Sequence, residues 1–169
     1  MRVERVFVLG ALLLAGAAWA QNGLDNPDWV EDKIPPPPAF SRDQLIPVDM
    51  PSYVSLKVGV DPQTLSVGAD GVVRYVMVMR NSSGSVNAVY EGIRCVSDEV
   101  KTYARAGNSG QWTLVEQPQW KPVNDNMPSR HAWAFARQGG CESRLSTSKD
   151  AIIKALQQRQ KPLRNNWGS

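Results

Sequence analysis

Two apolar runs separated by a short polar break dominate the middle of the chain. Residues Gly71–Cys95 read GVVRYVMVMRNSSGSVNAVYEGIRC, and the break is Asn81-Ser82-Ser83-Gly84. Both runs are rich in β-branched and aromatic residues, which favour strands, and a short polar segment between two such runs is typical of a hairpin turn. The pattern therefore predicts a β-hairpin over this stretch.

The position of the turn sets the register that we expect for this hairpin. With the turn centred on Ser82 and Ser83, residue 80 faces residue 85. Complementary pairs then face each other on successive rungs: Arg74 with Glu91, and Tyr75 with Tyr90. Directly opposed pairs contribute roughly 0.2–1 kcal/mol each, and a shift by one residue would lose both of them.

Both faces of the predicted hairpin are mostly apolar. One face carries Val72, Val76, Val78, Val89, Ile93 and Cys95. The opposite face carries Val73, Tyr75, Met77, Met79, Val86 and Ala88. Because both faces need cover, we expect the hairpin to lie centrally in an antiparallel sheet.

Shorter patterns extend this sheet on both sides. Alternating apolar residues predict a half-buried strand over Tyr53–Val60. Further strands are expected at Lys101–Arg105 and Gln111–Val115, which gives three to five antiparallel strands.

Helices are expected towards the C-terminus. Ser129–Gln138 alternates as a strand would, yet its alanines favour a helix, which we prefer while the strand stays open. Ser148 begins a variant of the capping box, so a second helix is predicted over Ser148–Gln160. The predicted fold class is α+β: an antiparallel sheet built on a central hairpin, with one or two C-terminal helices and one disulfide.

The first twenty residues have the three-part pattern of a secretory signal peptide. Arg2 and Arg5 precede an apolar core that ends in Ala18-Trp19-Ala20. The apolar run is short for a membrane span, which needs about 20 residues. The sequence therefore predicts cleavage after Ala20, a periplasmic location, and no membrane span in the remaining chain.

The rest of the chain divides by composition into an N-terminal proline-rich segment, a single domain and a tail. Residues 21–50 include Pro35-Pro36-Pro37-Pro38, which favours an extended polyproline helix. We interpret this segment as a strap or linker; the alternative is a docking ligand for an aromatic groove. Trp29 and Phe40 are unusual for a disordered linker, which is consistent with a strap that lies along the domain. A single domain is predicted over 51–161 and a C-terminal tail over 162–169.

Charge and metal-binding residues exclude some classes of function. The net charge is +3, of which Arg2, Glu4 and Arg5 supply +1, and the remaining charge is spread evenly. A nucleic-acid partner would require a basic stripe, so we expect none. One histidine and two cysteines provide too few ligands for a zinc site, and no metal or cofactor is expected.

Cys95 and Cys141 are the only cysteines in the chain. In an exported protein an even pair predicts a disulfide, which would restrict the unfolded chain by about 4 kcal/mol. The alternative is that Cys95 acts as a nucleophile with His131 as its base. We prefer the disulfide because no third orienting residue can be identified.

Aromatic residues and arginines point to recognition. Trp, Tyr and Arg dominate binding hot spots, so we hypothesise that Arg94, Trp112 and Trp120 form one side of a shallow site for a protein or an envelope glycan. The alternative for each of them is a place in the core. A deep cleft would instead favour an enzyme if it collected the following acid and base side chains: Glu91, Asp98, Glu99 and His131.

Several short blocks carry a resemblance to a known family. They are Val60-Asp61-Pro62 with Leu65, Asp70–Tyr75 (DGVVRY), Tyr90–Cys95 (YEGIRC), Tyr103-Ala104, and Trp112 and Trp120 ahead of Cys141. With these blocks the stretch from Trp29 to Cys141 resembles the cryptic neisserial protein family, small exported proteins of betaproteobacteria with an uncharacterised domain. The resemblance implies a periplasmic location in a Gram-negative cell and supplies no catalytic residues.

The sequence thus favours a non-enzymatic function. We expect a periplasmic binding or envelope-assembly factor whose partner is an envelope protein or glycan. The alternative is a small envelope hydrolase with an unrecognised site.

Overall fold

The computed structural model describes residues 26–124 and 130–160. The predicted signal peptide, its cleavage site after Ala20 and the predicted tail lie outside these residues. The strands are β1 (Ile46–Val48), β2 (Lys57–Val60), β3 (Ser66–Val67), β4 (Val72–Arg80), β5 (Val86–Arg94), β6 (Glu99–Ala106), β7 (Trp112–Leu114) and β8 (Lys121–Pro122). The helices are α1 (His131–Phe135), the π-helical turn η1 (Ala136–Gly140) and α2 (Lys149–Arg159).

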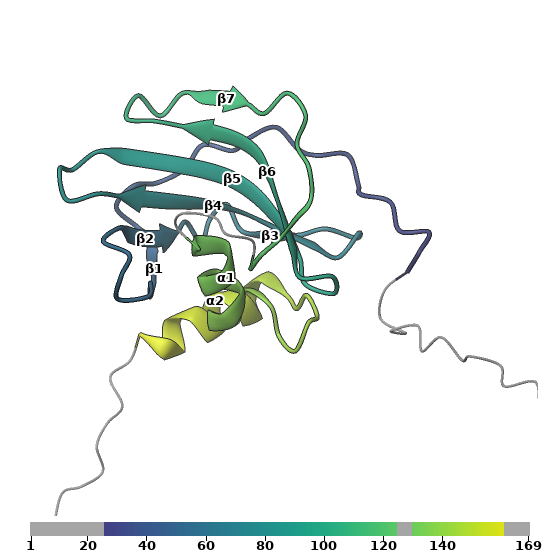
Figure 1. The fold of residues 1–169 in the computed structure, drawn as a ribbon. Coiled ribbons are helices and arrows are strands. Elements are labelled where there is room, and N and C mark those ends of the chain that lie inside the picture. The colour runs from purple at the N-terminus through teal and green to yellow at the C-terminus, as the bar shows by residue number, and fades with distance from the viewer. Residues whose placement is uncertain (1–25, 125–129, 161–169) are drawn as a thin grey trace, which may run out of the picture.

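All paired strands of the sheet run antiparallel. The order is β1-β2-β4-β5-β6-β7, with β3 paired to β4 and β8 paired to β6. The apolar runs of the sequence form β4 and β5, nine residues each, which lie in the middle of this order (Figure 1). The helices lie together below the sheet (Figure 1). The structure therefore confirms an antiparallel α+β fold with two short C-terminal helices.

The register between β4 and β5 differs by one residue from the predicted one. Arg80 faces Val86, because the chain turns through a loop of three residues whose last member, Gly84, has a φ of 84°. Asn81 and Ser85 close this loop: the Asn81 N–H donates to the Ser85 carbonyl at 3.1 Å. The predicted pairs were wrong, and the observed pairs are Arg74 with Gly92, Tyr75 with Glu91 and Val76 with Tyr90.

The shift exchanges the faces of β5, since side chains alternate along a strand. Val89, Ile93 and Cys95 lie in the same buried cluster as Val73, Tyr75 and Met77. Ala88 and Tyr90 lie in a second cluster with Val76 and Val78. Each predicted face therefore combined residues that lie on opposite faces of the observed hairpin. Both faces are covered, as expected.

The first cluster lies under the helices. Phe135 of α1 packs against Tyr75 with 4.2 Å between the ring centroids, and Ile152 and Leu156 of α2 are buried beside them. Ser148 caps α2, as predicted, by accepting a hydrogen bond from the Ala151 N–H. The predicted helix over 129–138 is observed as α1, followed by η1, which ends shortly after Gly139 with its φ of 132°.

The predicted disulfide is confirmed. Cys95, just after β5, is bonded to Cys141, just after η1, and their Cα atoms are 5.5 Å apart. The bond spans 46 residues and joins the end of β5 to the helical face. It also rules out a free thiol at Cys95, so the alternative of a Cys95 nucleophile is wrong.

The N-terminal strap covers the second cluster. Ile34, Phe40 and Leu45 pack against it, and the Trp112 indole N–H donates to the Pro38 carbonyl at 2.9 Å. The strap continues into β1, a strand that the sequence analysis missed. Conversely, the strand expected over 53–60 is shorter than predicted and begins at Lys57.

Candidate functional site

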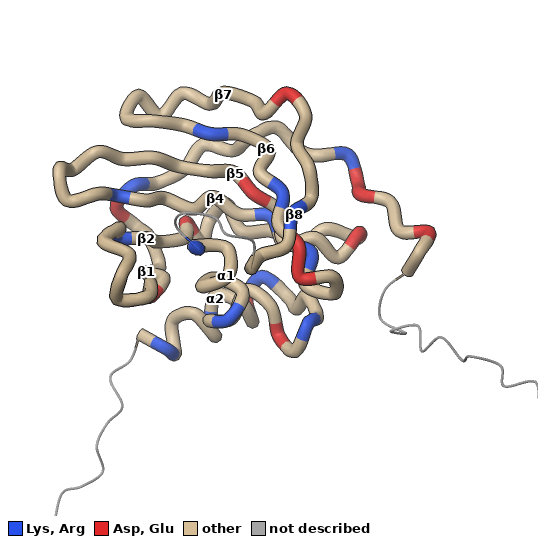
Figure 2. Tube along the Cα trace, viewed as in Figure 1, with Lys and Arg blue, Asp and Glu red and all other residues tan. Residues whose placement is uncertain are grey.

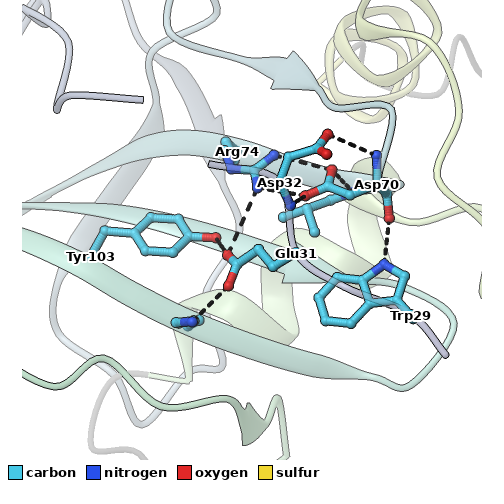
Figure 3. Close-up of polar contacts among 8 residues, drawn as sticks. Trp29, Glu31, Asp32, Asp70, Arg74 and Tyr103 are labelled. Carbon is cyan, nitrogen blue, oxygen red and sulfur yellow. Dashed lines mark hydrogen bonds and ion pairs between the residues drawn. The ribbon is translucent and has the colours of Figure 1, made fainter. Parts of the chain in front are cut away.

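Glu31 anchors the strap to the sheet. Its carboxylate accepts hydrogen bonds from the Lys101 ammonium at 2.6 Å and from the Tyr103 hydroxyl at 2.7 Å (Figure 3). The Arg74 guanidinium lies 3.8 Å away on the other side. Burial and the hydrogen bond to Glu31 raise the pKa of Tyr103. The phenol therefore stays protonated and keeps donating to the strap.

Asp70 holds the second anchor point, in the turn before β4. Arg74 donates to both of its carboxylate oxygens, at 3.2 and 2.6 Å, and the backbone N–H groups of Asp32 and Val72 donate to them as well. Burial alone would raise the pKa of Asp70, but these hydrogen bonds outweigh it and lower the pKa. The Asp70 carbonyl accepts the Trp29 indole N–H at 2.8 Å, which fixes the Trp29 ring (Figure 3).

A group of cations and aromatic rings lies around Trp29. The Arg94 guanidinium lies 4.1 Å from the Trp29 ring centroid, and Trp120 meets Trp29 edge to face at 5.9 Å. The Lys101 ammonium lies 5.4 Å from the Trp120 ring. All four side chains are partly exposed. We call this group, made of Trp29, Arg94, Lys101 and Trp120, the Trp29 surface.

The Trp29 surface contains two of the three predicted binding residues. Arg94 and Trp120 both contact Trp29, which the sequence analysis did not include in the site. The available signal was a tryptophan in an otherwise polar, proline-rich segment. Its contact with Arg94 depends on the strap folding back over the sheet, which spacing in the sequence does not reveal.

Trp112 lies elsewhere. It faces Ala106 at one end of β6, whereas Lys121, next to Trp120, faces Val100 towards the other end. Trp112 packs against Phe40 with 5.1 Å between the ring centroids and helps to hold the strap. The structure therefore does not bring Trp112 together with Arg94 and Trp120.

A small cavity of about 180 Å³ adjoins the Trp29 surface. Its walls include Trp29, Arg94, Arg144 and Ser146. Arg144 is held by the Val96 carbonyl at 2.7 Å, and cations and acids are interspersed at this end of the sheet (Figure 2). Guanidinium groups beside an indole offer both charge-assisted hydrogen bonds and a stacking face. The geometry thus suits a polar or anionic group that carries a flat face.

A second polar group is buried in the core. The Glu91 carboxylate lies 2.8 Å from His131 Nε2 and accepts hydrogen bonds from Tyr75 at 3.2 Å and from Thr102 at 2.9 Å. Burial disfavours both charges, but the attraction between Glu91 and His131 outweighs it: the pKa of Glu91 is lowered and the pKa of His131 is raised. The two groups form an ion pair.

The acid and base residues named in the sequence analysis do not share one cleft. Glu91 and His131 are 1% and 5% exposed, whereas Asp98 is exposed in the turn before β6. A cavity of about 510 Å³ is lined by Asp98 but by neither Glu91 nor His131. Glu99 accepts a hydrogen bond from Ser97 and lies 3.8 Å from Arg94.

Within 26–124 and 130–160, no group of three or more His, Cys, Asp or Glu side chains is placed to hold a metal ion. In the same part of the chain, no helix has the length and apolar character that crossing a membrane requires.

Fold and site together define a small α+β domain with helices and a disulfide on one face of its sheet and a strap on the other. The family model of the CNP1-like family matches residues 24–157, and the chain belongs to this family. It is 25% identical over 116 residues to Cryptic neisserial protein 1 of Neisseria gonorrhoeae. The match covers 61% of this chain and 57% of that relative, so this chain spans little more than half of the relative's length. No solved structure matches.

Proposed function

We propose that this protein is an exported, non-enzymatic binding or envelope-assembly factor that contacts a protein or glycan of the cell envelope through the Trp29 surface. The observation that carries the proposal is the Arg94 guanidinium, stacked 4.1 Å from a partly exposed Trp29 ring. The disulfide is compatible with an oxidising compartment outside the cytoplasm.

The Trp29 ring is already fixed before any partner binds. Its N–H is held by the Asp70 carbonyl, and Asp70 is held by Arg74, so little side-chain freedom remains to be lost on binding. Tryptophan and arginine are the residues most often found at binding hot spots. A fixed aromatic ring with a stacked cation therefore supports recognition.

A second candidate is the small envelope hydrolase. The pairing of Glu91 with His131 at 2.8 Å favours it, since a carboxylate that orients an imidazole is a common part of hydrolytic sites. Both side chains are buried, however, so a substrate would have to open the core to reach them. We therefore rank this function below binding.

In-cell photo-crosslinking tests the binding proposal. A photoreactive residue replaces exposed Gln119, beside Trp120, and a control places it at exposed Ser82 in the loop between β4 and β5. We expect one reproducible envelope partner from position 119, none from position 82, and loss of the crosslink in Trp120→Ala. Truncation of a hot-spot tryptophan costs about 2 kcal/mol or more of binding free energy.

The same partners at both positions, or an unchanged crosslink in Trp120→Ala, would contradict the proposal. A glycan partner is tested separately by titrating soluble envelope glycans and following tryptophan fluorescence. Mass spectrometry of the same glycans after incubation distinguishes the hydrolase, because cleavage products that disappear in Glu91→Gln would favour it.

A further inference from the structure

A groove lies at one end of the β4–β5 pair, and Arg94 lies at the other end. It has a volume of about 550 Å³, within the range of roughly 300–1,000 Å³ that small-molecule sites occupy. Arg80, at the last position of β4, is one of its walls, whereas Arg94 faces Val72, the first residue of that strand. The groove is therefore separate from the Trp29 surface.

Two cations face each other across one side of this groove. Lys57 of β2 is directly opposite Arg80 of β4, and both are exposed. Like charges in directly opposed positions destabilise a sheet. Among the described residues neither side chain has an ion pair or hydrogen bond to offset this repulsion.

The other charged groups of the groove leave an excess of positive charge. Arg42 also lines it, donating to the Asn108 carbonyl at 2.9 Å, and so do Asp43 and Asp49. Three cations and two carboxylates thus surround the same space. An occupant with a single negative charge would balance them and relieve the repulsion between Lys57 and Arg80.

Most of the remaining wall is apolar. The apolar lining residues are Leu45, Pro47, Val48, Met50, Leu56, Val58 and Val78, of which Leu45, Pro47, Met50 and Leu56 are partly or fully exposed. An inorganic anion would leave these four residues in water, whereas an alkyl chain would bury apolar surface that they expose. The groove therefore fits an amphiphile with one anionic end.

An added peptide strand is a poor occupant, although β1 lies at the edge of the sheet. Pro47 has no N–H to offer, and its carbonyl accepts a hydrogen bond from Gln160 Nε2 at 3.0 Å. The neighbouring Asp49 N–H donates to Gln138 Oε1 at 2.8 Å. With these backbone groups engaged, β1 lacks the free ladder that strand addition requires.

We propose that this groove binds a medium-chain fatty acid. The carboxylate lies between Lys57 and Arg80, and the alkyl chain runs along the wall towards Pro47 and Leu45, which lie on the same face of the sheet. Guanidinium and ammonium groups bind carboxylates through charge-assisted hydrogen bonds, which are stronger than neutral ones.

Isothermal titration calorimetry of the purified protein with dodecanoate, below its micellar concentration, tests this inference. The double variant Lys57→Gln/Arg80→Gln removes both charges from exposed positions, so the fold is retained, as circular dichroism will verify. Lys154→Gln, an exposed lysine on α2, is the matched control. Acetate and uncharged dodecyl maltoside separate the contribution of the head group from that of the chain.

We expect dodecanoate to bind the wild-type protein and Lys154→Gln equally, and the double variant about tenfold to a hundredfold more weakly. Acetate and dodecyl maltoside should bind much more weakly than dodecanoate. Absence of dodecanoate binding would overturn the inference. Equal binding of dodecyl maltoside, an unaffected double variant, or an equal loss in Lys154→Gln would overturn it too.

Discussion

His131 Nε2 lies 2.8 Å from the Glu91 carboxylate and so joins the first residue of α1 to the middle of β5. The observed register places Glu91 on this face, opposite Tyr75, whose hydroxyl donates to the same carboxylate. Helix and sheet are thus connected by a buried ion pair as well as by apolar contact. The ion pair exists only while His131 is protonated and Glu91 is deprotonated.

The pH dependence of stability follows from the two pKa shifts. The pKa of His131 is raised from 6.5, so its contribution is complete below 6.5 and is lost as the pH rises through the folded-state pKa. The pKa of Glu91 is lowered from 4.5, so its contribution is complete above 4.5 and is lost as the pH falls through its folded-state value. We expect the pair to contribute most to the free energy of unfolding between these two values.

Proton NMR provides the direct measurement, because the chain has one histidine and its imidazole signal needs no further assignment. The titration midpoint in the folded protein should lie above that of the same signal in concentrated urea. A midpoint at or below the unfolded value would show that burial, together with the repulsion from Arg105, outweighs the attraction of Glu91.

Breaking the pair should be costly. Glu91→Ala leaves His131 and the Tyr75 hydroxyl buried without this acceptor, and removal of one partner of a buried ion pair costs about 3–5 kcal/mol. Exposed Glu142→Ala is the matched control and should change the free energy of unfolding by less than about 0.5 kcal/mol. Urea denaturation measures both, and a similar small change in both variants would contradict a structural role for the pair.

Much of the sheet was predictable because β-branched and apolar residues mark strands wherever they lie. The register was not, because it depended on one backbone conformation. Gly84 adopts a positive φ, which gives a loop of three residues, and this single extra residue moved Glu91 from the expected partner Arg74 to Tyr75. The geometry of the turn thus set the register, and the two side-chain pairs expected from the sequence did not form.

The candidate site was predictable only in part. Arginine and tryptophan content pointed to Arg94 and Trp120, but both meet at Trp29, which comes from the strap. Trp112 has the same chemical character, yet it packs under Phe40 and Pro38. Residue type indicates what a side chain can bind, whereas long-range packing decides which side chains meet.

The disulfide should contribute strongly to stability. Closing a loop of 46 residues restricts the unfolded chain by about 4 kcal/mol in the entropy model, so Cys95→Ser/Cys141→Ser should lower the free energy of unfolding by a comparable amount. A thiol titration of the denatured, unreduced protein should find no free sulfhydryl. Two free sulfhydryls in protein purified without a reducing agent would disprove the bond.

Anchoring of the strap should depend on Glu31. Glu31→Ala removes the acceptor of Lys101 and Tyr103, and we expect a loss of about 1–3 kcal/mol and faster proteolysis within residues 26–45. Asp28→Ala, an exposed acidic residue of the same strap, is the control and should behave like the wild-type protein. Equal cleavage of all three proteins would indicate that the other contacts of the strap hold it without Glu31.

The loop between β4 and β5 offers a test of the observed register. A Cβ at Gly84 would meet no atom within 4 Å, so any cost of Gly84→Ala arises from its φ of 84°. We expect a loss of about 1–2 kcal/mol, and a smaller loss for Gly84→Asn because asparagine tolerates this conformation. Gly107→Ala is the matched control, since a Cβ there also meets open space but φ is not in the left-handed region; it should be nearly neutral. Chemical denaturation measures all three, and a neutral Gly84→Ala would imply a loop without the positive φ and hence a different pairing of β4 with β5.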